Sequence, residues 1–275
     1  MENELIFTRY LYSKSDVEQS LLICLLEHNY DASLFWAYEL YYSGFQIETF
    51  EFLLKIFNDI YISTNGDLSR FIQNAYDSWK NNADDCLIGS IVATLCIRNY
   101  ILNGFIATYF KVKCLDNDTP TSKRLVIHLK DANIVDHKTK PNTVGKMRLY
   151  LKDVCKYGVI KDFNHIFGND CLDLREQFYY NWIYYAANSP IWAERMKQFA
   201  GGKCSETKKI VFANDDMEED FYNNWGLEPD EQSVEIQNKC IGNYNKQLSI
   251  KEFCQRFGVK IITKTVKLKS SKLDK

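Results

Sequence analysis

The stretch from Asp31 to Ile62 constrains the fold most, because it carries ten large aromatic side chains around one central glycine. Phe, Tyr and Trp each bury a large apolar area, so rings at this density must lie in a core. Gly44 can adopt the left-handed conformation that ends a helix. We therefore predict two helices joined at Gly44, the first capped by Asp31 and the second running from about Ile47 to Ile62. Trp36 and Phe57 are predicted to be buried.

Helical patterns flank this hairpin on both sides. Apolar residues recur at helical spacing over 15–28, from Asp67 onward and over 83–102. The first hundred residues are thus predicted to form five helices joined by short turns, as a bundle or as helical hairpins.

The pattern changes between residues 105 and 143, where loops surround the sequence RLVIHLK at 124–130, a candidate short strand. Helical patterns return from residue 144, including one helix over 172–187 and another that starts at Ser189-Pro190. KKIVF at 208–212 is typical of a strand. Ser249 with Glu252 forms a capping box that opens a last helix.

The predicted fold class is mainly α: an N-terminal helical bundle or helical hairpins, plus a second helical part with a small β element. The predicted division is a helical bundle at 1–104, a connector at 105–143, a second helical region at 144–258 and a basic tail at 259–275.

Composition narrows the compartment and the kind of partner. Nine cysteines are widely spaced without a CxxC pair, which predicts free, reduced thiols and no zinc site. The start of the chain lacks the basic and apolar regions of a signal peptide, and no run reaches the length of a membrane span. We expect a soluble, cytoplasmic protein without membrane contact. The net charge of -2 gives no general attraction to nucleic acid.

An acidic segment from Asp215 to Glu235 holds nine carboxylates and no Lys or Arg. Acids favour the first turn of a helix, where they meet its positive end, so a solvated helix start is the first interpretation. A docking face for a basic partner is the second, and its candidate residues are Asp215, Asp216, Glu218, Glu219 and Asp220. The segment lacks the Gly and Glu that a calcium-binding EF-hand loop requires at its sixth and twelfth positions.

Basic residues gather at the other end of the chain, with seven from Arg256 onward against one acid, Asp274. They could neutralise phosphates, or they could form a solubilising tail. The candidate nucleic-acid contacts are Lys260, Lys264, Lys267, Lys269 and Lys272. LSIKEFCQRFGV at 248–259 resembles the first helix of a helix-turn-helix, but the following KIITKTVKLK is typical of a strand or tail.

Sequence patterns for known chemistries are missing. The chain has no phosphate-binding GxxxxGK[ST], no GxGxxG, no GxSxG and no HExxH. His128 and His137 stand nine residues apart, which no local metal motif requires. We therefore predict no catalytic residues, no metal, no cofactor and no enzyme activity.

Two resemblances add to these patterns. LFWAYELYYSGF at 34–45, YYNWIYYAANSPIWAERMKQF at 179–199 and FANDDMEEDFYNNWGLEPDEQS at 212–233 resemble an uncharacterised protein family of large double-stranded DNA viruses of protists. This resemblance implies a virus-encoded protein in infected-cell cytoplasm or a virion, and it implies no activity. Asp31-Ala32, Leu34, Trp36-Ala37 and Gly44 are similar to the helical collar of clamp-loader-like ATPases, without the ATPase module.

Together these observations predict a non-enzymatic adaptor or structural protein that binds other proteins. The alternative is a nucleic-acid-associated factor in viral replication or transcription that uses the basic tail. The protein partners and the oligomeric state are left open.

Overall fold

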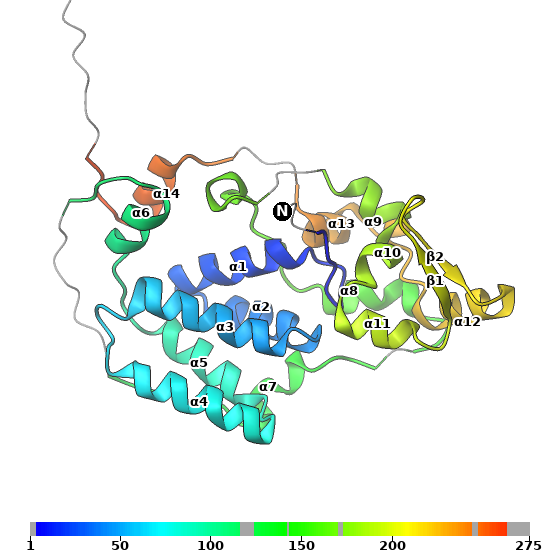
Figure 1. The fold of residues 1–275 in the computed structure, drawn as a ribbon, viewed down its shortest axis with the longest axis horizontal. Coiled ribbons are helices and arrows are strands. Elements are labelled where there is room, and N and C mark those ends of the chain that lie inside the picture. Colours follow the sequence, from blue (N-terminus) through cyan, green and yellow to red (C-terminus); the bar gives the residue numbers. More distant parts are fainter. Residues whose placement is uncertain (1–3, 116–123, 142, 170–172, 244–246, 263–275) are drawn as a thin grey trace, which may run out of the picture.

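The computed structural model describes residues 4–115, 124–141, 143–169, 173–243 and 247–262, and these are mainly helical with a two-stranded antiparallel sheet (Figure 1). The predicted fold class is therefore confirmed. The N-terminal helices are α1 (Lys14–Leu26), α2 (Tyr30–Tyr42), α3 (Gln46–Ile56) with the π-helical turn η1 (Phe57–Tyr61), α4 (Leu68–Asn82), α5 (Cys86–Cys96) and α6 (Asn103–Tyr109).

The first hundred residues form the five predicted helices, α1 to α5, with α2 packed against both α1 and α5. Two predicted boundaries were wrong. The side chain of Asn29, not Asp31, caps α2 by accepting a hydrogen bond from the amide of Ala32 at 3.2 Å. The helix predicted to reach Leu102 ends at Cys96.

Gly44 separates α2 from α3, as predicted, with a φ of +99°. A Cβ atom at this position would lie 2.4 Å from Cβ of Pro190, at the start of α11 (Pro190–Met196). Glycine is therefore required twice, by the backbone conformation and by the close approach of the second half of the chain.

The candidate strand at 124–130 was wrong, since this segment runs extended along α5 and pairs with no strand in the described part of the chain. Side chains of α5 take the place of that partner. The amide of Ile127 donates to the hydroxyl of Thr94 at 3.0 Å, and the amide of Leu129 donates to the hydroxyl of Ser90 at 2.9 Å. β-Branched residues thus indicated an extended backbone but not what it would bond to.

The second half is built from shorter elements. They are α7 (Asp131–Ile134), η2 (Val135–His137), η3 (Met147–Leu149), α8 (Tyr150–Val154), η4 (Asn164–Phe167), α9 (Arg175–Tyr180), α10 (Trp182–Ala186), α11, β1 (Ala200–Cys204), β2 (Lys209–Phe212), α12 (Asp215–Trp225), η5 (Pro229–Glu231), α13 (Val234–Ile241) and α14 (Ile250–Arg256). The single helix predicted over 172–187 is wrong, because the chain breaks at Asn181 into α9 and α10.

Local signals in this half were otherwise reliable. Pro190 is the first residue of α11, and Ser249 and Glu252 form the capping box of α14. KKIVF supplies β2, whose register with β1 pairs Ala200 with Phe212 and Cys204 with Lys209. Strand β1 was not predicted, because its two glycines, Gly201 and Gly202, are typical of a helix end.

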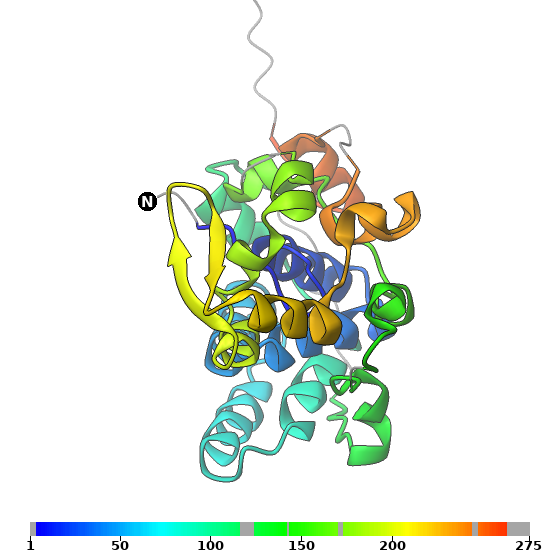
Figure 2. The same ribbon diagram turned by 90° about the vertical axis from the view of Figure 1, so that its right-hand side faces the viewer.

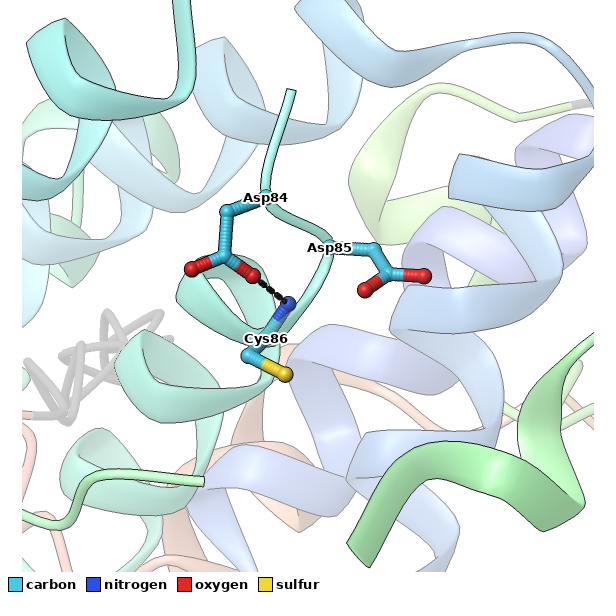
Figure 3. A group of neighbouring side chains, drawn as sticks. All are labelled: Asp84, Asp85 and Cys86. Carbon is cyan, nitrogen blue, oxygen red and sulfur yellow. Dashed lines mark hydrogen bonds between the residues drawn. The ribbon is translucent and has the colours of Figure 1, made fainter. Parts of the chain in front are cut away.

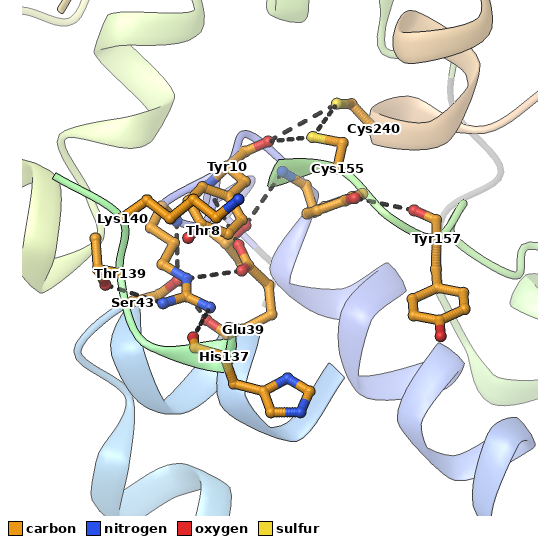
Figure 4. Close-up of polar contacts among 12 residues, drawn as sticks. Thr8, Tyr10, Glu39, Ser43, His137, Thr139, Lys140, Cys155, Tyr157 and Cys240 are labelled. Atoms are coloured by element: carbon orange, nitrogen blue, oxygen red, sulfur yellow. Dashed lines mark hydrogen bonds and ion pairs between the residues drawn. The ribbon is translucent and has the colours of Figure 1, made fainter. Parts of the chain in front are cut away.

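A buried ion pair ties the N-terminal segment 5–13 to both halves. Arg9 and Glu39 are almost fully buried, and Nε of Arg9 lies 2.8 Å from Oε2 of Glu39. The same guanidinium donates to the carbonyl of His137 and the hydroxyl of Thr139, each at 2.9 Å (Figure 4). The groups that accept hydrogen bonds from this guanidinium therefore lie on α2 and on the 137–140 loop.

One contiguous core draws buried residues from all of 1–104, 105–143 and 144–258. The predicted domain boundaries after residues 104 and 143 are not tested by this core and stay predictions. Trp36 and Phe57 belong to this core with exposures of 0% and 2%, which confirms their predicted burial. The Trp36 ring lies edge-on to Tyr12, with 5.1 Å between the ring centroids.

We predict that Trp36→Ala lowers the free energy of unfolding by roughly 3–5 kcal/mol, the usual loss for a large aromatic side chain in a core. Chemical denaturation followed by circular dichroism measures this change. Tyr180→Ala is the matched control, because the Tyr180 side chain is 72% exposed. An unchanged stability of Trp36→Ala would contradict the role of this ring in the core.

We also predict that Arg9→Met costs roughly 3–5 kcal/mol, because it leaves the carboxylate of Glu39 buried without its partner. The double variant Arg9→Met with Glu39→Gln should lose less than the single variant, since no unpaired charge remains. A double-mutant cycle from denaturation curves measures this coupling. Additive losses would show that the two charges do not depend on each other.

Candidate partner-docking site

The acidic segment forms helix α12 at the surface. Asn214 caps the helix, its side chain accepting a hydrogen bond from the amide of Met217 at 2.9 Å. Asp215, Asp216 and Glu218 occupy the first turn, where the helix dipole stabilises negative charge. The predicted helix start is confirmed.

Phe221 is the one fully buried anchor of α12. Its ring packs against Phe199 at 5.6 Å and against Phe212 of β2 at 5.3 Å between centroids. Figure 2 shows α12 beside the β1–β2 hairpin on the outside of the fold. Phe221 therefore fixes the inner face of α12 and leaves its acidic face in solvent.

A second anchor holds the C-terminal end of α12. The guanidinium of Arg195 lies between two rings, 4.1 Å from the centroid of Trp225 and 4.4 Å from that of Trp192. Burial lowers the pKa of Arg195 to about 10, so the group stays charged at neutral pH and interacts with both rings. This stacking joins α12 to α11, and the acidic helix is held at two points along its length.

The carboxylates of α12 form no ion pair with the part of the chain that the structure describes. Asp215, Asp216, Glu218, Glu219 and Asp220 are all exposed, and no described basic side chain lies within 4 Å of them. Two later acids of the segment are paired: Glu231 with Arg148 at 2.5 Å and Glu235 with Lys239 at 3.0 Å. Five acids of α12 thus have no basic partner among the described residues, whereas Glu231 and Glu235 are paired within the fold.

Of the five basic candidates, Lys260 is the one that lies among the described residues. Lys260 is exposed next to Ile261, which forms an isolated β-bridge with Cys114. The carbonyl of Lys260 accepts from the amide of Leu115 at 2.8 Å, which fixes its backbone. The other four candidates, Lys264, Lys267, Lys269 and Lys272, lie outside the described residues.

Two carboxylates and a thiol come together before α5 (Figure 3). Asp84 accepts a hydrogen bond from the amide of Cys86 at 2.9 Å. Asp85 accepts from the hydroxyl of Tyr42 at 2.5 Å and pairs with Lys138 at 3.3 Å. Desolvation, reinforced by the neighbouring acids, raises the pKa of Cys86 to about 11, so its thiol stays protonated. These contacts stabilise the start of α5.

The eight described cysteines are free thiols, which confirms the prediction for them, while Cys171 lies outside the described residues. Cys155 and Cys240 are buried with their sulfurs 3.6 Å apart, near the carbonyl of Tyr10 (Figure 4). Their contact crosses 85 residues of sequence, so spacing could not reveal it. Burial raises the pKa of Cys240 well above its usual value.

We predict that Cys204 is alkylated by iodoacetamide before Cys155 and Cys240. Hydrogen bonding from Thr207 lowers the pKa of the Cys204 thiol, and its side chain is partly exposed, whereas the other two are buried. Mass spectrometry of peptides after timed labelling under native conditions measures the order. Labelling in denaturant should erase the difference, and early native labelling of Cys240 would contradict its burial.

Comparison with protein-family models, with curated proteins and with solved structures found no match. Among the described residues, every helix is too short or too polar to cross a membrane.

Proposed function

We propose that this chain is a non-enzymatic adaptor that binds a basic protein partner through the acidic face of α12. The observation that carries the proposal is the set of five exposed carboxylates without basic partners among the described residues. Together with the resemblance to a viral protein family, the proposal places the adaptor in infected-cell cytoplasm or in a virion.

The geometry of α12 suits recognition of a positively charged surface. Asp215, Glu219 and Tyr222 follow one another at spacings of four and three residues, so they share one outward face of the helix. Exposed charges mainly raise the association rate and select the partner, whereas an aromatic side chain adds buried contact area. Tyr222 is 39% exposed and supplies that area within the acidic face.

We predict that Glu218→Lys with Glu219→Lys abolishes capture of basic proteins by the full chain, because two attractive charges become repulsive. The measurement is quantitative affinity purification from expressing cells, followed by titration of each purified partner at rising salt. Affinity should fall with salt, as expected for exposed charges.

The matched control is Glu48→Lys with Glu51→Lys, which reverses two exposed acids on α3. It should retain the partners, and both variants should keep the melting temperature of the wild type. Partners that survive the α12 reversal would contradict the proposed docking face. Partners lost on nuclease treatment would instead favour the nucleic-acid-associated alternative.

A further inference from the structure

A cavity of about 410 Å³ lies between α1, the junction of α3 with η1, α6 and the η4 segment. These elements are at the end of the molecule away from α12 (Figure 1). The volume lies within the range of roughly 300–1,000 Å³ that is typical of small-molecule sites. The cavity is therefore large enough for one compact organic ligand.

Aromatic rings form much of the wall. Phe105, Phe110 and Phe167 line the cavity and pack on one another, with ring centroids 5.7 to 6.2 Å apart. Phe52 of α3 lines it from another side. Aromatic faces carry partial negative charge, so they bind apolar groups and also attract organic cations.

The charged residues of the lining are two acids and one base. Asp59 binds the ammonium of Lys55 at 2.6 Å and accepts a hydrogen bond from the hydroxyl of Tyr109 at 2.8 Å. Glu18 is paired only loosely with Lys14, at 3.4 Å, and Lys14 does not line the cavity. Desolvation raises the pKa of Glu18, whose side chain keeps 31% of its surface exposed. The lining therefore holds two carboxylates and one ammonium, and Lys14 lies beside Glu18 just outside it.

The backbone beside the cavity is unusual. The turn η1 is a π-helix, and its residues Asp59 and Ile60 both line the cavity. Such turns are rare inside helices and occur frequently at functional sites. This observation is independent of the volume and charge of the cavity, and it indicates the same place.

We propose that the cavity binds a small organic cation, an amine that carries an aromatic or branched apolar body. The ammonium lies beside Glu18 and the body packs on the phenylalanine rings. An anionic ligand of the same shape meets two carboxylates, and a neutral one gains only the apolar contacts. This site is independent of the proposed docking face on α12.

Three ligands with one ring system test the charge requirement: tryptamine, indole and indole-3-acetate. We expect isothermal titration calorimetry on the full chain to rank their affinities in that order, and tryptamine to raise the melting temperature by mass action. Glu18→Gln should raise the Kd for tryptamine about tenfold and leave the Kd for indole unchanged. Glu51→Gln, exposed on α3 outside the cavity, is the matched control and should bind as the wild type does.

A second variant tests whether the ligand binds in this cavity. Ser15 lines the cavity and is partly exposed, so Ser15→Trp should fill the space and remove binding of tryptamine and indole while the protein keeps its fold. Undiminished binding by a folded Ser15→Trp variant overturns the site. Equal affinity for indole-3-acetate and tryptamine overturns the charge requirement. No binding of tryptamine at millimolar concentration overturns the proposal as a whole.

Discussion

The buried pair of Arg9 and Glu39 is the interaction on which the rest of the structure depends. A charge in a core is tolerated only when its partners are fixed, and here the partners come from α2 and from the 137–140 loop. The pair therefore specifies how two distant parts of the chain meet. Around it, Trp192 donates from its indole nitrogen to the carbonyl of Thr8 at 3.0 Å, which adds α11 to the same assembly.

Local signals predicted the helices, because helix formation depends on spacing and on caps within a few residues. The hairpin at Gly44, the start of α11 at Pro190 and the capping box at Ser249 were all visible in the sequence. Predictions that depended on distant partners were less successful. The segment 124–130 is extended as its composition indicates, yet its hydrogen-bond partners are Ser90 and Thr94 of α5.

The two proposed sites also differ in how far the sequence alone predicts them. The acidic composition of α12 can be read from one segment, but the lack of basic neighbours among the described residues is a tertiary property. The cavity could not be predicted, because its wall combines α1, α3, α6 and η4, and each phenylalanine alone is typical of a core position. The π-helical turn η1 also has no signature in FNDIY that distinguishes it from an ordinary helix.

The position of segment 5–13 has a consequence for biosynthesis. Its rings and polar groups meet residues 137–240, as when Phe7 packs on Phe178 and Tyr12 donates to the carbonyl of Tyr157. The ribosome makes 5–13 long before these partners. Arg9 can meet Glu39 early, but its contacts with His137 and Thr139 and the cover of Phe7 by Phe178 form only after the second half is made. Long-range closure of this kind slows folding and exposes the chain to aggregation. The packing around segment 5–13 therefore completes only after the second half has emerged.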